Sequence, residues 1–135
     1  MKIPLSSLTI LFLTAGAHAG TVIYTDHSHP VTGEVSPDIT VTELDAPDRL
    51  LAQQFGPLSA APAQAEQQAR AVIASPAFRQ SQQALAASYA GVAHAWSLGL
   101  EKYPAVVFDD KWVVYGTTDV AAARAKLNAL REKQP

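Results

Sequence analysis

Residues 102–116, KYPAVVFDDKWVVYG, give the clearest indication of the fold. Two short runs of β-branched and aromatic residues, 105–108 and 112–115, are separated only by the polar residues 109–111. Such residues suit a pleated, half-buried surface, so the pattern predicts a β-hairpin. Neither run alternates between apolar and polar residues. We therefore expect protein to cover both faces of the sheet that contains this hairpin.

Pro104 stands where the first strand of the hairpin begins. Proline is tolerated at that position because the first residue of a strand can do without an N–H. Two alternatives are open for this residue. It either begins the strand with an ordinary trans bond, or it forms a cis bond with Tyr103, as about 5–6% of X–Pro bonds do.

The N-terminal residues predict a secretory signal peptide. Lys2 is positively charged, residues 3–16 are largely apolar, and residues 17–19, Ala-His-Ala, are typical of a cleavage site. The alternative is an uncleaved membrane anchor, but the apolar run is shorter than the roughly 20 residues that span a bilayer. We expect cleavage after Ala19, which leaves residues 20–135 as a single periplasmic domain without a membrane span.

The composition argues against several classes of function. Ten basic and twelve acidic side chains give a net charge of −2, and cleavage removes Lys2 and makes it −3. There is no basic tract that would follow a phosphate backbone, so direct nucleic-acid binding is not expected. The chain has no cysteine, which excludes thiol and disulfide chemistry and leaves packing as the source of stability.

Strands and helices are expected in a mixed order along the rest of the chain. Strands are predicted at 21–25 and 39–44, and helices at 45–55, 63–74, 76–98 and from 119 onward. Helix N-caps are predicted at Asp45, Ser75 and either Asp119 or Thr118, which have preferred residue types, and Pro47 and Pro76 suit the first helical turn. This order predicts a mixed four-stranded sheet with helices on both faces.

The longest predicted helix, 76–98, has large apolar residues at helical spacing. They are Phe78, Leu85, Tyr89, Val92 and Trp96. A stripe of this kind usually faces the core of a domain, and we expect it to do so here. The alternative is that Tyr89 and Trp96 mark a surface that a partner covers, since aromatic residues are enriched at protein interfaces.

The predicted order of elements resembles the thioredoxin-like fold. Asp26-His27-Ser28-His29-Pro30 stands where a thioredoxin has its Cys-x-x-Cys loop, and Tyr103-Pro104-Ala105 stands where it has its cis-proline. The resemblance implies an α/β, thioredoxin-like domain with a mixed four-stranded sheet flanked by helices. Both cysteines are absent, so it implies no redox activity.

Parts of the chain also resemble a family of uncharacterised exported proteins encoded by bacterial integrating conjugative elements. The matching segments are VIYTDHSHP at 22–30, VTELDAP at 41–47, and GVAHAWSLG, KYPAVVF and VVYGTTDV at 91–99, 102–108 and 113–120. The resemblance implies a periplasmic part of a conjugative, type IV secretion-like apparatus, with other components of that apparatus as partners. It supplies no catalytic residues.

Candidate partner-binding residues come from the polar loop and the proline turn, which we expect to lie side by side. They are Asp26, His27, Ser28, His29, Pro30, Tyr103 and Pro104. Two histidines at i and i+2 could hold a metal, but zinc needs three or four ligands and the expected mature chain has only one other histidine, His94. We expect no metal and no cofactor, with a metal-binding or chaperone-like module as the alternative function. Gly-x-Ser-x-Gly, P-loop and dinucleotide motifs are absent, so we do not expect an enzyme.

Overall fold

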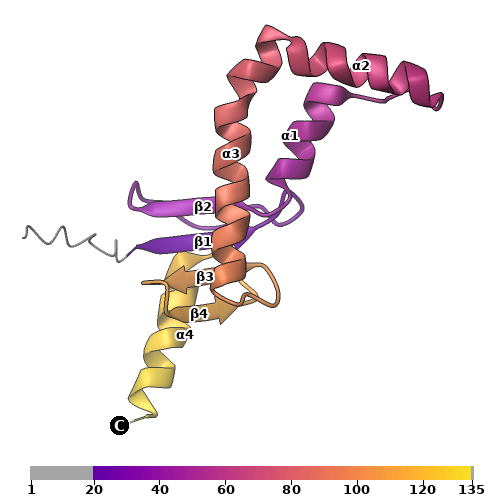
Figure 1. The fold of residues 1–135 in the computed structure, drawn as a ribbon. Coiled ribbons are helices and arrows are strands. Elements are labelled where there is room, and N and C mark those ends of the chain that lie inside the picture. Colours follow the sequence, from indigo (N-terminus) through magenta and orange to yellow (C-terminus); the bar gives the residue numbers. More distant parts are fainter. Residues whose placement is uncertain (1–19, 135) are drawn as a thin grey trace, which may run out of the picture.

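The computed structural model describes residues 20–134, and the expected signal peptide lies outside this range. Four strands form one mixed sheet in the order β2-β1-β3-β4 (Figure 1). β1 (Thr21–Thr25) pairs in parallel with β2 (Ile39–Glu43) and antiparallel with β3 (Ala105–Phe108). β3 forms the predicted hairpin with β4 (Trp112–Tyr115). The mixed four-stranded α/β architecture is therefore confirmed.

The hairpin turn explains why aspartates interrupt the two apolar runs. Asp109 and Asp110 both have left-handed backbone conformations, with φ of 55° and 52°. The Lys111 N–H donates to the Phe108 carbonyl at 3.1 Å and closes the turn. Asp tolerates this conformation better than most residues, so the backbone geometry of the turn accounts for both aspartates.

Within residues 20–134 four helices accompany the sheet, close to the predicted ranges: α1 (Ala46–Phe55), α2 (Pro62–Ala74), α3 (Pro76–Ser97) and α4 (Val120–Glu132). The Ser75 hydroxyl accepts the Phe78 N–H at 3.2 Å, and the Asp119 carboxylate accepts the Ala122 N–H at 3.1 Å. These two predicted N-caps are thus formed, and each satisfies a donor that the first helical turn leaves free, whereas the side chain of Asp45 makes no cap bond.

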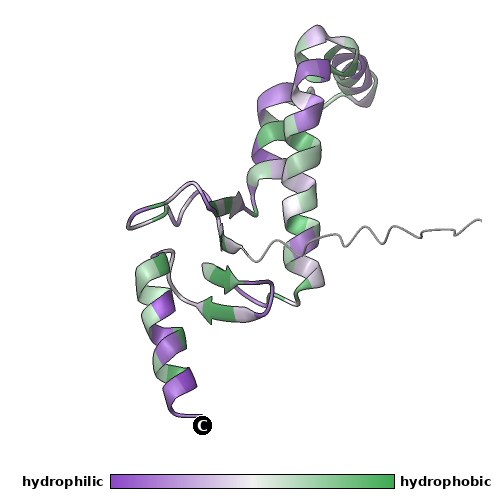
Figure 2. Cartoon of the chain, turned by 90° about the vertical axis from the view of Figure 1, so that its left-hand side faces the viewer, coloured by the Kyte–Doolittle hydropathy of each residue, from purple (hydrophilic) through white to green (hydrophobic). Residues whose placement is uncertain are grey.

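Helices cover both faces of the sheet, as the hairpin sequence predicted (Figure 2). α4 packs on one face, where the buried residues are Ile23, Val106, Phe108, Val114, Val120, Ala123 and Leu127. The C-terminal part of α3 packs on the other face, where Ala95 meets Tyr24 and Val107. The sheet therefore separates two small cores and is buried at its centre.

α3 crosses the sheet and continues past the edge strand β2 to meet α1 and α2 (Figure 1). In this projecting part Phe55 of α1 meets Phe78 of α3 edge to face, with ring centroids 5.8 Å apart. α2 has no buried residue. The projecting helices thus depend on contacts with one another rather than on the core of the sheet.

The predicted core-facing stripe along α3 is wrong for its two C-terminal aromatic residues. Trp96 is 84% exposed and Tyr89 is 49% exposed, whereas Ala95 is buried. The reason is that the side of α3 facing the sheet carries Ser88, Gly91 and Ala95. Tyr89 and Trp96 each lie one residue, about 100°, further round the helix. Both rings lie at the surface, which is compatible with the alternative that a partner covers them.

Candidate functional site

The two predicted site segments lie side by side. We call Asp26–Pro30 the histidine loop and Tyr103–Pro104 the proline turn. β1 runs into the loop and β3 begins after the turn, and Tyr24 pairs with Ala105 across these antiparallel strands. The His29 and Tyr103 rings meet edge to face at 6.4 Å between centroids. The predicted proximity of the two segments is confirmed.

The proline turn leaves part of its main chain free. The Tyr103–Pro104 bond is cis, which is the second of the two alternatives for this proline. The Pro104 carbonyl accepts the Gly116 N–H at 2.8 Å. Within residues 20–134, neither the N–H nor the carbonyl of Tyr103 takes part in a hydrogen bond, and its side chain is 49% exposed. This residue can therefore offer both a donor and an acceptor to another chain.

Asp26 organises the histidine loop from within. Its carboxylate accepts the His29 N–H at 2.9 Å and contacts the His29 Nδ1 at 2.6 Å. The hydrogen bond with the His29 ring, helped by attraction to that ring when protonated, lowers the pKa of the Asp26 carboxyl below its usual value. The Thr25 hydroxyl donates to the His29 carbonyl at 2.6 Å. These bonds hold the loop in a turn with the side chains of His27 and His29 exposed.

Two residues distant in sequence anchor the loop from outside. The His27 N–H lies 3.2 Å from both carboxylate oxygens of Asp45, which in turn pairs with Arg49. The Thr118 hydroxyl, buried beside α4, donates to the Pro30 carbonyl at 3.1 Å. Asp45 was predicted only as a helix cap, but its side chain makes no cap bond. For both anchoring residues, the only indication in the sequence was their place in segments of the family resemblance. Asp45 lies in segment 41–47 and Thr118 in segment 113–120.

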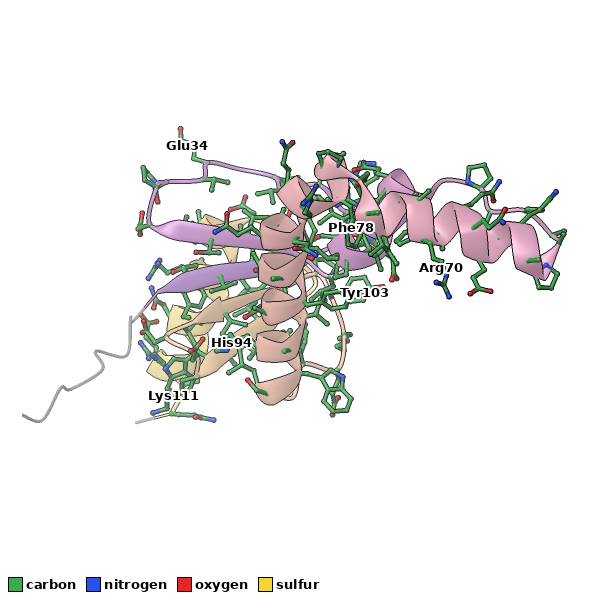
Figure 3. The ribbon with its side chains drawn as sticks, turned by 45° about the horizontal axis from the view of Figure 1, so that its top comes forward. Glu34, Arg70, Phe78, His94, Tyr103 and Lys111 are labelled. Carbon is green, nitrogen blue, oxygen red and sulfur yellow. The ribbon has the colours of Figure 1, made fainter. Side chains whose placement is uncertain are left out.

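The chemistry of the site is that of hydrogen bonding and stacking. Within the described range, no three His, Cys, Asp or Glu side chains are grouped to hold a metal. His94 does not join the other two histidines, because its ring faces Asp110 at 3.0 Å; Figure 3 shows it on the other side of α3 from Tyr103. Ser28 has no hydrogen bond to either loop histidine among residues 20–134, so the site has no serine–histidine pair.

Residues 18–133 match a family described as a protein of unknown function, DUF1525. The chain belongs to this DUF1525 family. Membership of an uncharacterised family is what the sequence resemblance implied. No curated protein and no solved structure matches the chain. Among residues 20–134, no helix is long and apolar enough to cross a membrane.

In this DUF1525 protein the site continues into an apolar pocket beside the proline turn. The pocket has a volume of about 180 Å³, and its lining includes Leu44, Val92, Trp96, Leu100 and Tyr103. Exposed aromatic residues around an apolar depression are typical of protein interfaces. In the sequence, Trp96 was indicated by the alternative of a partner-covered surface and by its place in segment 91–99, and Leu44 only by its place in segment 41–47. Nothing in the sequence indicated Leu100.

Proposed function

We propose that this DUF1525 protein is a non-catalytic component of the conjugative, type IV secretion-like apparatus of an integrating conjugative element. It acts in the periplasm after loss of residues 1–19, in assembly or protein–protein interaction. The observation that carries the proposal is the joint surface of the histidine loop and the proline turn. That surface offers exposed donors, acceptors and an aromatic ring, and it contains no cysteine.

The link to conjugation is supported by where the matching segments lie in the fold. Segment 22–30 supplies β1 and the histidine loop, and segment 41–47 supplies Asp45, which anchors that loop. Segments 91–99, 102–108 and 113–120 supply Trp96, the proline turn and Thr118. Segments far apart in the chain thus meet at one surface, which supports a shared role for that surface in the family.

We also propose that the domain is a thioredoxin-like variant that serves as a binding scaffold. The strand order and the position of the proline turn beside the loop after β1 support this proposal. Two departures set the variant apart. The segment between β1 and β2 contains no helix, and the chain contains no cysteine. Without thiols, the surface beside the proline turn is available for binding alone.

Binding would combine main-chain and side-chain contacts. The free N–H and carbonyl of Tyr103 suit an extended backbone, since one residue of a strand presents both groups on the same side. His27 and His29 add polar contacts beside it, and the pocket at Trp96 accepts an apolar side chain. Such a combination of a small apolar centre with a polar rim is the usual composition of a protein interface.

The test is a pair of variants in donor cells that carry the intact element. In one variant His27 and His29 are both replaced by Ala, and in the other Tyr103→Ala removes the exposed ring. We expect lower transfer frequency and weaker co-purification of apparatus proteins with the tagged chain. Melting temperatures should stay within a few degrees, because surface changes cost about 0.5 kcal/mol or less.

His94→Ala is the matched control, because it removes the remaining histidine of residues 20–134 at a distance from the site. It should leave transfer unchanged. Normal transfer by the double histidine variant and by Tyr103→Ala would refute the proposed site. A chain that keeps its N-terminal 19 residues in the inner membrane would refute the periplasmic assignment.

A further inference from the structure

The outer edge of β2 presents unpaired main-chain groups. β2 pairs in parallel with β1, and the Leu44 N–H donates to the Thr25 carbonyl at 2.8 Å. Since main-chain groups alternate along a strand, those of Thr42 point toward β1 as well. The N–H and carbonyl groups of Val41 and Glu43 therefore point away from β1. Within residues 20–134 no further strand lies on that side.

The other edge of the sheet, at β4, is protected by cations. Lys102 lies over the Tyr115 ring at 5.3 Å, and Lys111 and Arg131 lie over the Trp112 ring at 5.1 and 4.7 Å. Charged side chains of this kind are a common means of preventing strand addition. β2 has a single charged residue, Glu43 at its C-terminal end, which pairs with Arg49, and residues 39–42 are uncharged. The two edges thus differ, and β2 is the one that can accept a strand.

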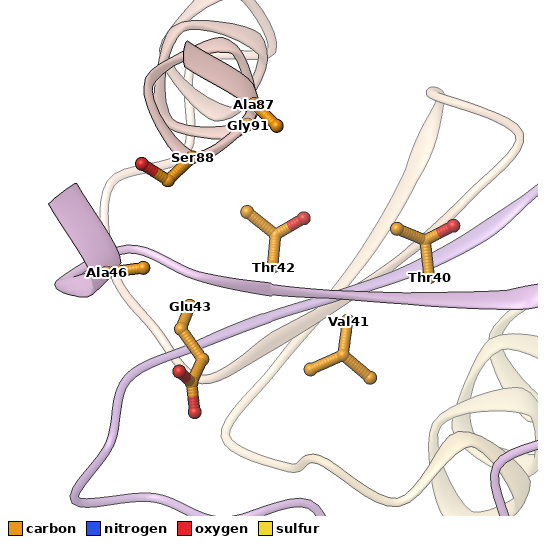
Figure 4. A pocket seen from close by; sticks show the side chains of 8 residues that line it. All are labelled: Thr40, Val41, Thr42, Glu43, Ala46, Ala87, Ser88 and Gly91. Carbon is orange, nitrogen blue, oxygen red and sulfur yellow. The ribbon is translucent and has the colours of Figure 1, made fainter. Parts of the chain in front are cut away.

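A hollow of about 400 Å³ lies beside the β2 edge, under α3 (Figure 4). Its lining residues are Thr40, Val41, Thr42, Glu43, Ala46, Ala87, Ser88 and Gly91. The Thr40 and Thr42 side chains point toward α3, and Ala87, Ser88 and Gly91 are all small (Figure 4). The hollow therefore has room for a side chain supplied from outside.

α3 extends over one face of the position that a further strand beside β2 would take. It lies against β2 at Gly91, where a Cβ atom would be 2.7 Å from the Thr42 Cγ2. Neighbouring strands are about 4.8 Å apart, and a helix rises about 1.5 Å per residue. Because α3 runs across the strands, one helical turn along it corresponds to about one strand spacing. The turn before Gly91 therefore lies over the position that a fifth strand beside β2 would occupy. That turn holds Ala87 and Ser88, and the helix continues outward from there (Figure 1).

We propose that the β2 edge binds an extended segment of a partner protein as a fifth strand, with an apolar side chain in the hollow under α3. The free groups of Val41 and Glu43 select an extended backbone, and the methyl groups of the lining select an apolar side chain. This surface shares no residue with the histidine loop or the proline turn, so it does not depend on the function proposed above.

An extended segment fits this edge better than a second copy of the chain. Stable interfaces between folded proteins use about 20–30 residues a side, and β2 offers five. A single extended segment needs fewer residues, because β2 and α3 contact it at the same time. Its alternate side chains lie under α3, and the others lie on the side of Val41, which is 40% exposed.

The test uses the mature chain labelled with ¹⁵N and two capped heptapeptides, Lys-Thr-Val-Thr-Val-Thr-Lys and its Phe-for-Val analogue. At low millimolar peptide we expect the amide resonances of Val41, Glu43, Ser88 and Gly91 to shift. Amide exchange should slow at Val41 and Glu43, and Val113 on β4 should not respond. A peptide with Pro at alternate positions should not bind, because it lacks the donors.

Two variants test the two halves of the proposal. Val41→Pro removes an outward N–H, which an edge strand tolerates, and should weaken peptide binding by about tenfold or more. Ala87→Phe fills the hollow and should weaken it comparably. Ala86→Phe, exposed on the same helix but outside the lining, is the matched control and should bind normally.

Either of two results would overturn the proposal. One is the absence of shifts along β2 with both peptides, or shifts confined to β4. The other is unchanged affinity in Ala87→Phe and in a folded Val41→Pro variant. Dimerisation without peptide that shifts the same β2 resonances would assign the edge to a second copy instead.

Discussion

Replacing Gly91 by Ala sets two effects of similar size against each other. Gly91 lies inside α3, where Ala is favoured over Gly by about 1 kcal/mol. An added Cβ would lie 2.7 Å from the Thr42 Cγ2 on β2, which is closer than carbon atoms approach without movement. Overpacking of this kind costs about 1–3 kcal/mol. We therefore expect Gly91→Ala to lower the free energy of unfolding, by up to about 2 kcal/mol.

The same contact predicts that Thr42→Ser reverses the sign of the effect. Serine lacks the Cγ2 methyl, and the Thr42 Oγ1 lies at 3.6 Å from the added Cβ, an ordinary contact. In the Thr42→Ser background, Gly91→Ala should raise the free energy of unfolding by about 1 kcal/mol, the helix preference alone. The coupling between the two sites should then be about 1–3 kcal/mol, within the range seen for residues in contact.

Urea unfolding of the four proteins, followed by circular dichroism, measures this double-mutant cycle. The single Thr42→Ser variant supplies the cost of the lost methyl group and is subtracted within the cycle. An equal effect of Gly91→Ala in both backgrounds would mean that Thr42 does not limit the approach of α3 to β2. That outcome would refute the packing described for these two elements.

Three further predictions concern single side chains. Thr118→Val should lower the free energy of unfolding by about 1–2 kcal/mol and speed amide exchange at Thr32, whose N–H donates to that hydroxyl at 3.0 Å; Thr118→Ser should lose less. His29→Ala should raise the lowered pKa of Asp26 toward its usual value, as measured by a carboxyl NMR titration. In the unsubstituted protein, the stability that this carboxylate contributes should disappear as the pH falls through its pKa. Burial raises the pKa of the Tyr24 phenol to about 12. In an absorbance titration, Tyr24→Phe should therefore show one phenol fewer ionising near that pH. The free energy of unfolding of the unsubstituted protein should fall as the pH rises through that value.

The sequence by itself determined the strands and helices, and it determined that the histidine loop and the proline turn belong to the candidate site. Runs of β-branched and aromatic residues fit the pleated, half-buried surface of a sheet. The side chains of Ser75 and Asp119 each accept the N–H of the residue three positions further along the helix. The histidine loop and the proline turn could be placed together because they adjoin strands that the implied fold makes neighbours. Local chemistry and strand order were sufficient for these predictions.

Only the tertiary structure decided which surfaces are free and which distant residues meet. Periodicity shows that one side of α3 is apolar, but the side that α3 turns toward the sheet decides that Ala95 is buried and Trp96 exposed. The bonds of Asp45 to His27 and of Thr118 to Pro30 depend on the register of chain segments far apart in sequence. The open edge of β2 likewise follows from strand order and helix length together, because whether an edge is covered depends on elements that the strand's own residues do not specify.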